Sequence, residues 1–451
     1  MIRSSQSRSD HRPSAYGAPF WFAYAANAMT MIAIALLFRY ADFITLLGGS
    51  ELHLGWIVGV GMVGSLAMRL LMGLGIDHYG PRLVWLGSLA AFVVVCFAHL
   101  AITSCHGPAI YLLRIVLCCS LAGVFGASMT FISSRVSPDR VAEMIGMLGT
   151  SGFVGMVLGT QLGDFLLGSA TIDRTQVQRM FLCAGLLGVG ALAFAFLATL
   201  GQTRPSPKQH AGLLELLRRY HPGSVLLVGV AMGIALGLPT TFLRMFAAEL
   251  QISRIGVFFG VYALAAIVTR LLTRRLPQRL GTTPMILSGM AVLVVSQLLF
   301  LLVDVEWQLV LPGIGYGVAH AIMFPSVIAA GCRLFPAEHR GLGTTLMLST
   351  WDVGQLIGAP MAGAIVHYTG LLGLPSYPIM FATVGLLLAV VTLMYARTAG
   401  GAGLPIERTV ELCPNPLADR FPDLQSAAPV VGPPQCLADD AGELAAGDRL
   451  R

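Results

Sequence analysis

The chain has 451 residues, of which 56% are hydrophobic and only 11% are charged, and its formal net charge is +6. This composition excludes an ordinary water-soluble globular protein and indicates a membrane protein. The basic residues are scattered through short loops and form no patch, so nucleic-acid binding is not expected. The eight cysteines show neither metal-ligand spacing nor an extracellular pairing pattern, so neither a metal site nor a disulfide framework is predicted.

Apolar runs long enough to cross a bilayer recur along the chain, because a spanning helix needs about 20 mostly apolar residues. Twelve spans are predicted, beginning near Phe20, His53, Arg82, Ala109, Ala142, Gln178, Ser224, Ser253, Thr283, Gln308, Gly341 and Pro375. Arginine and lysine concentrate in every second interval, which puts both termini in the cytoplasm by the positive-inside rule. The sequence therefore predicts an all-α integral protein of the plasma (inner) membrane, whose first helix is not a cleaved signal peptide.

The spans divide into two groups of six. A cytoplasmic N-terminal segment, 1–18, precedes a first six-helix bundle at 19–200. A linker at 201–223 contains prolines and one short amphipathic helix, and a second six-helix bundle follows at 224–397. The tail at 398–451 has no hydrophobic periodicity and is predicted to be disordered in the cytoplasm.

The two bundles are copies of one unit. The stretch from Arg69 to Arg82 recurs in altered form from Arg270 to Gly281, and each copy follows a glycine, Gly55 or Gly256, at the same spacing. Internal symmetry between two groups of helices is typical of secondary transporters.

A second repeat consists of small residues at intervals of three or four. They leave one face of the fifth and of the eleventh helix nearly free of side chains. These residues are Gly152, Gly155, Gly159 and Gly163 in the fifth helix and Gly354, Gly358 and Ala362 in the eleventh. Two interpretations stay open: static close packing, or a sliding interface used in alternating access.

Residues 73–82, with the sequence GLGIDHYGPR, resemble the loop between helices 2 and 3 of the major facilitator superfamily, which reads G-x-x-x-D-[RK]-x-G-[RK]-[RK]. His78 and Pro81 stand where that family usually has basic residues. The resemblance covers roughly residues 20–397. It implies twelve helices in two pseudo-symmetric six-helix bundles, with helices 1, 4, 7 and 10 lining a central cavity.

The same resemblance implies a cytoplasmic gate. Its residues would be Gly73, Asp77, Gly80 and Arg82. The Asp77 carboxylate would face the N-terminus of helix 11, which favours an anion. The alternative is a solvated aspartate in a turn.

Charged residues within spans are candidate functional sites, because a charge at mid-bilayer costs about 2.5–3.5 kcal/mol on insertion scales. The arginines of this kind are Arg39, Arg69, Arg114, Arg244 and Arg270. The resemblance implies that Arg39, Arg114 and Arg244 face the central cavity, where they could bind a substrate carboxylate or phosphate. The alternative is local pairing, with Asp42 and Glu249, or snorkelling. For Arg69 and Arg270, gating and snorkelling both remain open.

Two further groups suit proton coupling. Asp352 is the carboxylate placed nearest the middle of the membrane, and His320 in helix 10 lies at a similar depth. Either could take up and release a proton during transport. The alternative is a hydrogen-bonded aspartate that fixes helix packing and a core histidine.

No nucleotide-binding loop, zinc spacing or nucleophile elbow is present, so neither an enzyme nor a cofactor is predicted. The leading hypothesis is a monomeric secondary transporter of a small molecule, coupled to protons. Export is slightly favoured, because the fifth helix partly matches an exporter motif, although Thr160 and Asp164 replace its proline and last glycine. The alternatives are an organic-anion uptake permease, or a non-transporting membrane receptor or scaffold. The sequence identifies neither the substrate nor the direction of transport.

Overall fold

The computed structural model describes residues 16–136, 140–168, 172–201, 223–273, 276–335 and 340–401. Side chains are described in these ranges except at 73–78, 141–142, 277–278, 340–342 and 400–401. The predictions for the linker and the tail therefore lie almost wholly outside the described residues.

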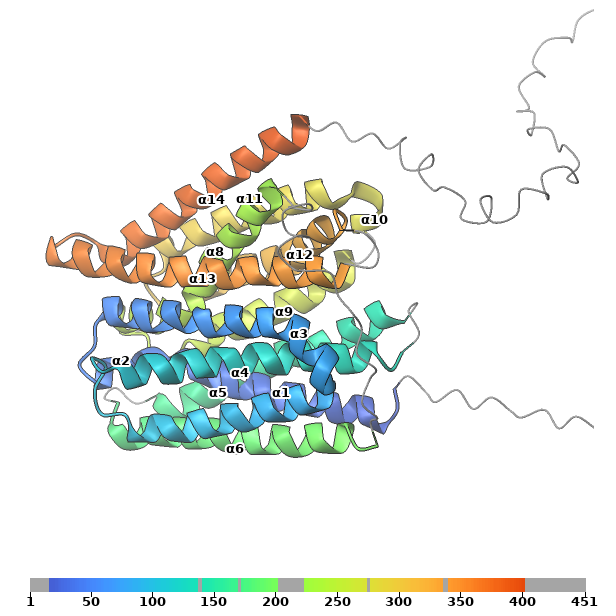
Figure 1. Ribbon diagram of the computed structural model, residues 1–451. Helices are drawn as coiled ribbons and strands as arrows, with labels where there is room; N and C mark the ends of the chain where they lie inside the picture. The colour runs from blue at the N-terminus through green and yellow to red at the C-terminus, as the bar shows by residue number, and fades with distance from the viewer. Residues whose placement is uncertain are drawn as a thin grey trace, which may run out of the picture. The chain divides into compact units, whose positions relative to one another are not determined.

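All regular structure in the described ranges is helical, which confirms the predicted all-α fold (Figure 1). The long helices are α1 (Ala18–Leu36), α3 (Glu51–Ala98), α4 (Pro108–Ser133), α5 (Val141–Leu167), α6 (Arg174–Ala198), α8 (Ser224–Glu249), α9 (Gly256–Thr273), α11 (Thr282–Leu299), α12 (Val310–Cys332), α13 (Arg340–Leu371) and α14 (Ser376–Gly401). The short ones are η1 (Leu37–Arg39), α2 (Tyr40–Leu46), η2 (His99–Ala101), α10 (Leu276–Leu280), η3 (Phe300–Leu302) and η4 (Glu306–Leu309).

Eleven segments in the described ranges are long and apolar enough to cross a membrane. Helix α3 supplies two of them, Glu51–Met72 and Tyr79–Ala101. Helix α13 is also long enough, with 32 residues, but Asp352 and its other polar residues lower its hydropathy. Together these segments account for the twelve predicted spans. The first residue of each segment lies within a few residues of the predicted start of that span.

The repeated motif has the same backbone conformation in both copies. Gly80 has φ 79° and forms a kink within α3 just before Pro81. Gly281, its counterpart in the second copy, has φ 81° at the N-terminus of α11. Side chains disfavour this left-handed region, so glycine is required at both bends. The internal repeat read from the sequence is therefore present in the backbone.

Successive spans run antiparallel, so the connections gather at two sides. We call the side where α1 and α8 begin the terminus side, and the side of loops 47–50, 102–107, 250–255 and 372–375 the opposite side. The first half of the fold is α1–α6 and the second half is α8–α14. Both halves belong to one compact unit that ends at Gly401.

The glycine faces of α5 and α13 pack mainly within their own halves in this conformation. A Cβ atom at Gly155 or Gly159 would overlap α1, and one at Gly354 would overlap the backbone of α8. The close approach between the halves uses other glycines. A Cβ atom at Gly55 of α3 would overlap the backbone of Ala359 in α13, and these two helices lie side by side in Figure 1. This arrangement favours static packing for the α5 and α13 faces.

Candidate functional site

Charged side chains join the two halves at the opposite side. The members of this opposite-side cluster are Arg39, Asp42, Asp164 and Arg244. Arg39 is only 1% exposed, and its Nε donates to Asp42 Oδ2 at 2.7 Å while its Nη1 donates to Asp164 Oδ1 at 2.9 Å. It also donates to the backbone oxygens of Leu167 (2.7 Å) and Ser253 (3.3 Å). Each of its three nitrogens therefore has a protein acceptor.

Arg244 enters the same cluster from the second half. Its Nε lies 2.8 Å from Asp42 Oδ1, in an ion pair whose angle is not that of a hydrogen bond. Its Nη1 donates weakly to the backbone oxygen of Ile252, at 3.5 Å. The Asp42 carboxylate thus lies between two guanidinium groups, one from each half. Buried pairs of this kind are costly to break, because the remaining charge is left without a partner.

Asp164 connects α5 to the N-terminus of α9. Its Oδ2 accepts a hydrogen bond from the backbone N–H of Gly256 at 2.6 Å, and its Oδ1 accepts one from Ile255 at 3.3 Å. A carboxylate is favoured there because the first N–H groups of a helix have no partner within the helix. This is the type of contact that the resemblance implied for Asp77 and helix 11. The side chain of Asp77 lies outside the described residues, so its gate role remains a prediction.

The other predicted gate residues lie in α3. Gly73 is in helical backbone, and Gly80 forms the kink described above. The guanidinium of Arg82 lies 5.5 Å from the centre of the Phe196 ring in α6, within the first half. None of these contacts tests gating.

A second polar connection between the halves involves Asp352. This aspartate of α13 is 3% exposed and accepts hydrogen bonds from two residues of α3. Ser65 Oγ donates at 2.7 Å and Arg69 Nε at 2.5 Å. The predicted proton-coupling residue is therefore the partner of one of the predicted intramembrane arginines.

His320 lies in a group of rings that we call the ring cluster. Its members are Phe153, Tyr262, His320, Phe324 and Trp351. His320 Nδ1 and the Tyr262 hydroxyl are 2.5 Å apart. Among the described residues no hydrogen bond links His320 with Asp352, although Trp351, the neighbour of Asp352, belongs to the cluster. A proton exchange between His320 and Asp352 remains a prediction.

Two arginines differ from the others in their partners. The guanidinium of Arg270 in α9 lies 5.2 Å from the centre of the Phe153 ring, and that of Arg114 in α4 lies 4.7 Å from the centre of the Tyr40 ring. Both Nε atoms are buried without a hydrogen-bond partner. Within the part of the chain that the structure describes, neither arginine has a carboxylate partner.

The three arginines that the resemblance placed around one cavity do not form a single group in this conformation. Arg39 and Arg244 meet at Asp42, and each of the three Arg39 nitrogens already donates to a protein acceptor in this conformation. Arg114 stands apart from this cluster, beside Tyr40. Local pairing with Asp42, the alternative weighed from the sequence, describes the contacts of Arg39.

Sequence reasoning did not single out Asp164 or Ser65 as site residues. The available signal for Asp164 was its position in the glycine-rich helix 5, where a charged residue replaces the last glycine of the motif. A serine gives no comparable signal.

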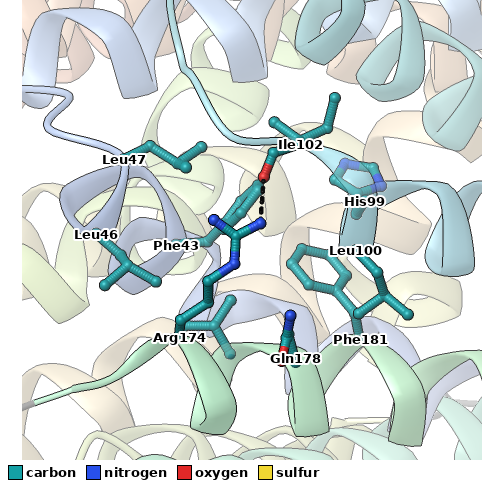
Figure 2. A pocket seen from close by; sticks show the side chains of 10 residues that line it. Phe43, Leu46, Leu47, His99, Leu100, Ile102, Arg174, Gln178 and Phe181 are labelled. Carbon is teal, nitrogen blue, oxygen red and sulfur yellow. Dashed lines mark hydrogen bonds between the residues drawn. The ribbon is translucent and has the colours of Figure 1, made fainter.

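Figure 2 shows a pocket at the opposite side of the first half, lined by α2, η2 and α6. Arg174 crosses it and donates to the backbone oxygen of Ile102 at 3.4 Å. Aromatic rings, including the stacked pair His99 and Phe181, line the rest. Because all its lining residues belong to the first half, this pocket is separate from the contacts between the halves.

A family model described as Major Facilitator Superfamily matches residues 20–305 and, in a second match, 225–416. The chain belongs to the major facilitator superfamily. This membership confirms the resemblance seen at residues 73–82 and agrees with an integral membrane transporter.

Individual relatives are distant. The chain is 35% identical over 82 residues to a putative tartrate transporter of Agrobacterium vitis, and this match spans 18% of each protein. It is 24% identical over 352 residues to the human MFS-type transporter SLC18B1, covering 72% of this chain and 74% of that protein. The crystal structure of the nucleoside transporter NupG superimposes with a TM-score of 0.67 at 11% identity, covering 86% of this chain and 99% of that one, which shows the shared fold.

Proposed function

We propose that this superfamily member is a secondary transporter of small organic anions. The observation that carries the proposal is an imbalance of charge within the spans. Arg39, Arg69 and Arg244 pair with aspartates, whereas Arg114 and Arg270 have no carboxylate partner among the residues that the structure describes. Unpaired buried guanidinium groups are costly, and an anionic substrate would compensate for them.

Alternating access would use the contacts between the halves. In this conformation the opposite-side cluster and the Gly55–Ala359 approach hold the two halves together at the opposite side. Transport requires a second state in which these contacts open. The cluster consists of ion pairs and hydrogen bonds that can re-form in each cycle, which suits a reversible closure.

Proton coupling, as proposed from the sequence, would act through Asp352. Protonation of its carboxylate would remove the charge that Arg69 binds and would weaken the connection between α3 and α13. A proton would then favour separation of the halves near the middle of the membrane. The direction of transport, export or uptake, and the monomeric state stay predictions from the sequence.

The similarity to a putative tartrate transporter favours the organic-anion hypothesis over export of a neutral drug-like molecule. That match is short, so it supports a class of substrate rather than tartrate itself. A non-transporting receptor or scaffold would need neither the reversible cluster at the opposite side nor the Asp352 pair.

The test is uptake of radiolabelled tartrate and benzoate into proteoliposomes that contain a pH-sensitive dye. The parent protein should move at least one of these anions together with protons. The Asp352→Asn variant should lose the proton movement, whereas Asp304→Asn, an exposed aspartate in a loop, should behave as the parent. Transport of neither anion would contradict the proposed function, and equal proton movement in the Asp352→Asn variant would contradict the coupling role.

A further inference from the structure

The two copies of the repeat differ at one pair of positions within the membrane. Arg69 and Arg270 occupy equivalent positions, fourteen residues after Gly55 and Gly256. Arg69 binds Asp352, which lies two residues before Gly354 in the eleventh span. The equivalent residue, two before Gly155 in the fifth span, is Phe153.

The structure brings Arg270 to this phenylalanine, as the symmetry requires. Its guanidinium lies 5.2 Å from the centre of the Phe153 ring, where the other copy has an ion pair at 2.5 Å. The geometry of the pair is thus kept while the carboxylate is absent. A cation over a ring recovers only part of the stabilisation that a carboxylate gives.

The part of α5 beside this guanidinium carries glycines in place of larger side chains. A Cβ atom at Gly149 of α5 would meet only Arg270 Nη1, 3.7 Å away, and one at Gly146 would meet nothing within 4 Å. At Gly152 the nearest atom would be 3.9 Å away, in Met31. Further along the same helix, a Cβ atom at Gly155 would overlap α1. At Gly149, therefore, no side chain of α5 separates the helix from Arg270 Nη1.

The surroundings of Arg270 are aromatic. Phe153 contacts His320, with ring centres 6.0 Å apart, and His320 contacts Trp351 at 5.9 Å. The Tyr262 hydroxyl and His320 Nδ1 form the polar contact within this group. A ligand that binds Arg270 would therefore place its body against rings that come from both halves of the fold.

We propose that Arg270 binds the carboxylate of the transported anion, in the place that Asp352 takes in the other copy, and that the body of the anion packs against the ring cluster. The site would favour a monocarboxylate with an apolar or aromatic body, because one guanidinium and several rings converge there. This inference rests on the proposed function and assigns its binding residue. Because α5, α9, α12 and α13 all contribute, a bound anion would connect the two halves.

The test is equilibrium binding of radiolabelled benzoate and tartrate to the purified protein in detergent. In the Arg270→Gln and Phe153→Asp variants, the Kd for benzoate should rise about 100-fold, because one loses the guanidinium and the other gives it an internal carboxylate. Phe153→Asn removes the ring without adding charge and should raise the Kd by only about threefold, the order of a lost cation–π and ring contact. Arg254→Gln, an exposed arginine at the opposite side, serves as the unchanged control.

The outcomes separate this inference from the proposed function. Parent-like benzoate binding in folded Arg270→Gln protein would overturn the inference while organic-anion transport stands. If Phe153→Asp does not fold, Arg270→Lys decides, because a charge without the planar fork should give an intermediate loss. Binding of tartrate alone would overturn the aromatic site, and binding or transport of neither anion by the parent would overturn the proposed function itself.

Discussion

Two pairs of arginines and several glycines recur in the two halves of the fold, but the carboxylates do not. Arg39 corresponds to Arg244 and Arg69 to Arg270, whereas Asp42, three residues after Arg39, corresponds to an alanine, Ala247. In the same way Asp164, nine residues after Gly155, corresponds to Gly363, nine residues after Gly354. Each acid is therefore present in one copy only.

The consequence is that two of the buried ion pairs cross between the halves, Arg244 with Asp42 and Arg69 with Asp352, whereas Arg39 pairs within the first half. Arg244 has no acid at the equivalent position and shares Asp42 with Arg39. Arg69 reaches Asp352 in the other half, and its counterpart Arg270 reaches a phenylalanine. Because the arginines are repeated and the aspartates are not, some ion pairs join the two halves, and Arg270 contacts a ring where Arg69 contacts a carboxylate.

The largest effect should come from the most heavily bonded of these arginines. Arg39→Gln would leave buried Asp42 and Asp164 without their main partner, at a cost of about 3–5 kcal/mol, typical of a broken buried pair. Arg244→Gln removes one ion pair and one weak hydrogen bond, so its cost should be smaller, about 1–3 kcal/mol. Thermal unfolding in detergent would measure both.

The decisive result is which of the two arginine variants loses more stability. Equal losses, or a larger loss for Arg244→Gln, would show that the two copies contribute alike and would contradict the asymmetry. Arg254→Gln controls for loss of an exposed arginine at the same side.

A smaller but more specific effect is expected at Asp164. Asp164→Asn keeps the size of the side chain but removes the charge that binds Arg39 and the N-terminus of α9. The closed opposite side should lose about 2–3 kcal/mol, enough to populate the open state visibly. Spin labels at Ser104 and Asp304 lie in one loop of each half. Electron paramagnetic resonance should show a longer distance between the two labels in Asp164→Asn than in the parent.

The matched control for Asp164 is Asp173→Asn. Asp173 is also an aspartate at the opposite side, but its carboxylate accepts from Gln176 at the start of its own helix α6. The Asp173→Asn substitution should leave the distance between the two spin labels unchanged. An unchanged distance in Asp164→Asn as well would mean that the contact with α9 does not hold this side closed.

The sequence was sufficient for the fold because the relevant signals are local. Apolar run length gave the spans, and the repeated glycines gave the symmetry, which the positive φ of Gly80 and Gly281 now shows in the backbone. Helix α13 was among the spans predicted from apolar run length, despite its polar residues.

The sequence did not show which charged side chains form ion pairs with one another. Arg39 and Asp164 are 125 residues apart, and Arg69 and Asp352 are 283 apart. Whether such side chains meet depends on the rotation of each helix about its axis and on the conformational state, neither of which hydropathy reports. The sequence therefore identified Arg39, Arg69, Arg244 and Asp352 as notable and named Asp42 as a local partner. It did not predict that Arg244 shares Asp42, that Arg39 pairs with Asp164 or that Arg69 pairs with Asp352.

The smallest expected effect concerns the left-handed backbone conformation that Gly80 and Gly281 share. Gly80→Ala and Gly281→Ala should each destabilise the protein by about 1–2 kcal/mol, because alanine is strained in the left-handed region. Gly87→Ala, in the regular helix after the kink with nothing within 4 Å of its added Cβ atom, should be neutral or stabilising by up to about 1 kcal/mol. Unfolding temperatures of the three variants would check this. Similar losses at Gly80 and Gly281 would mean that the repeat preserves a backbone requirement in both copies while its acids diverged, and a loss at only one would extend the asymmetry from charge to backbone.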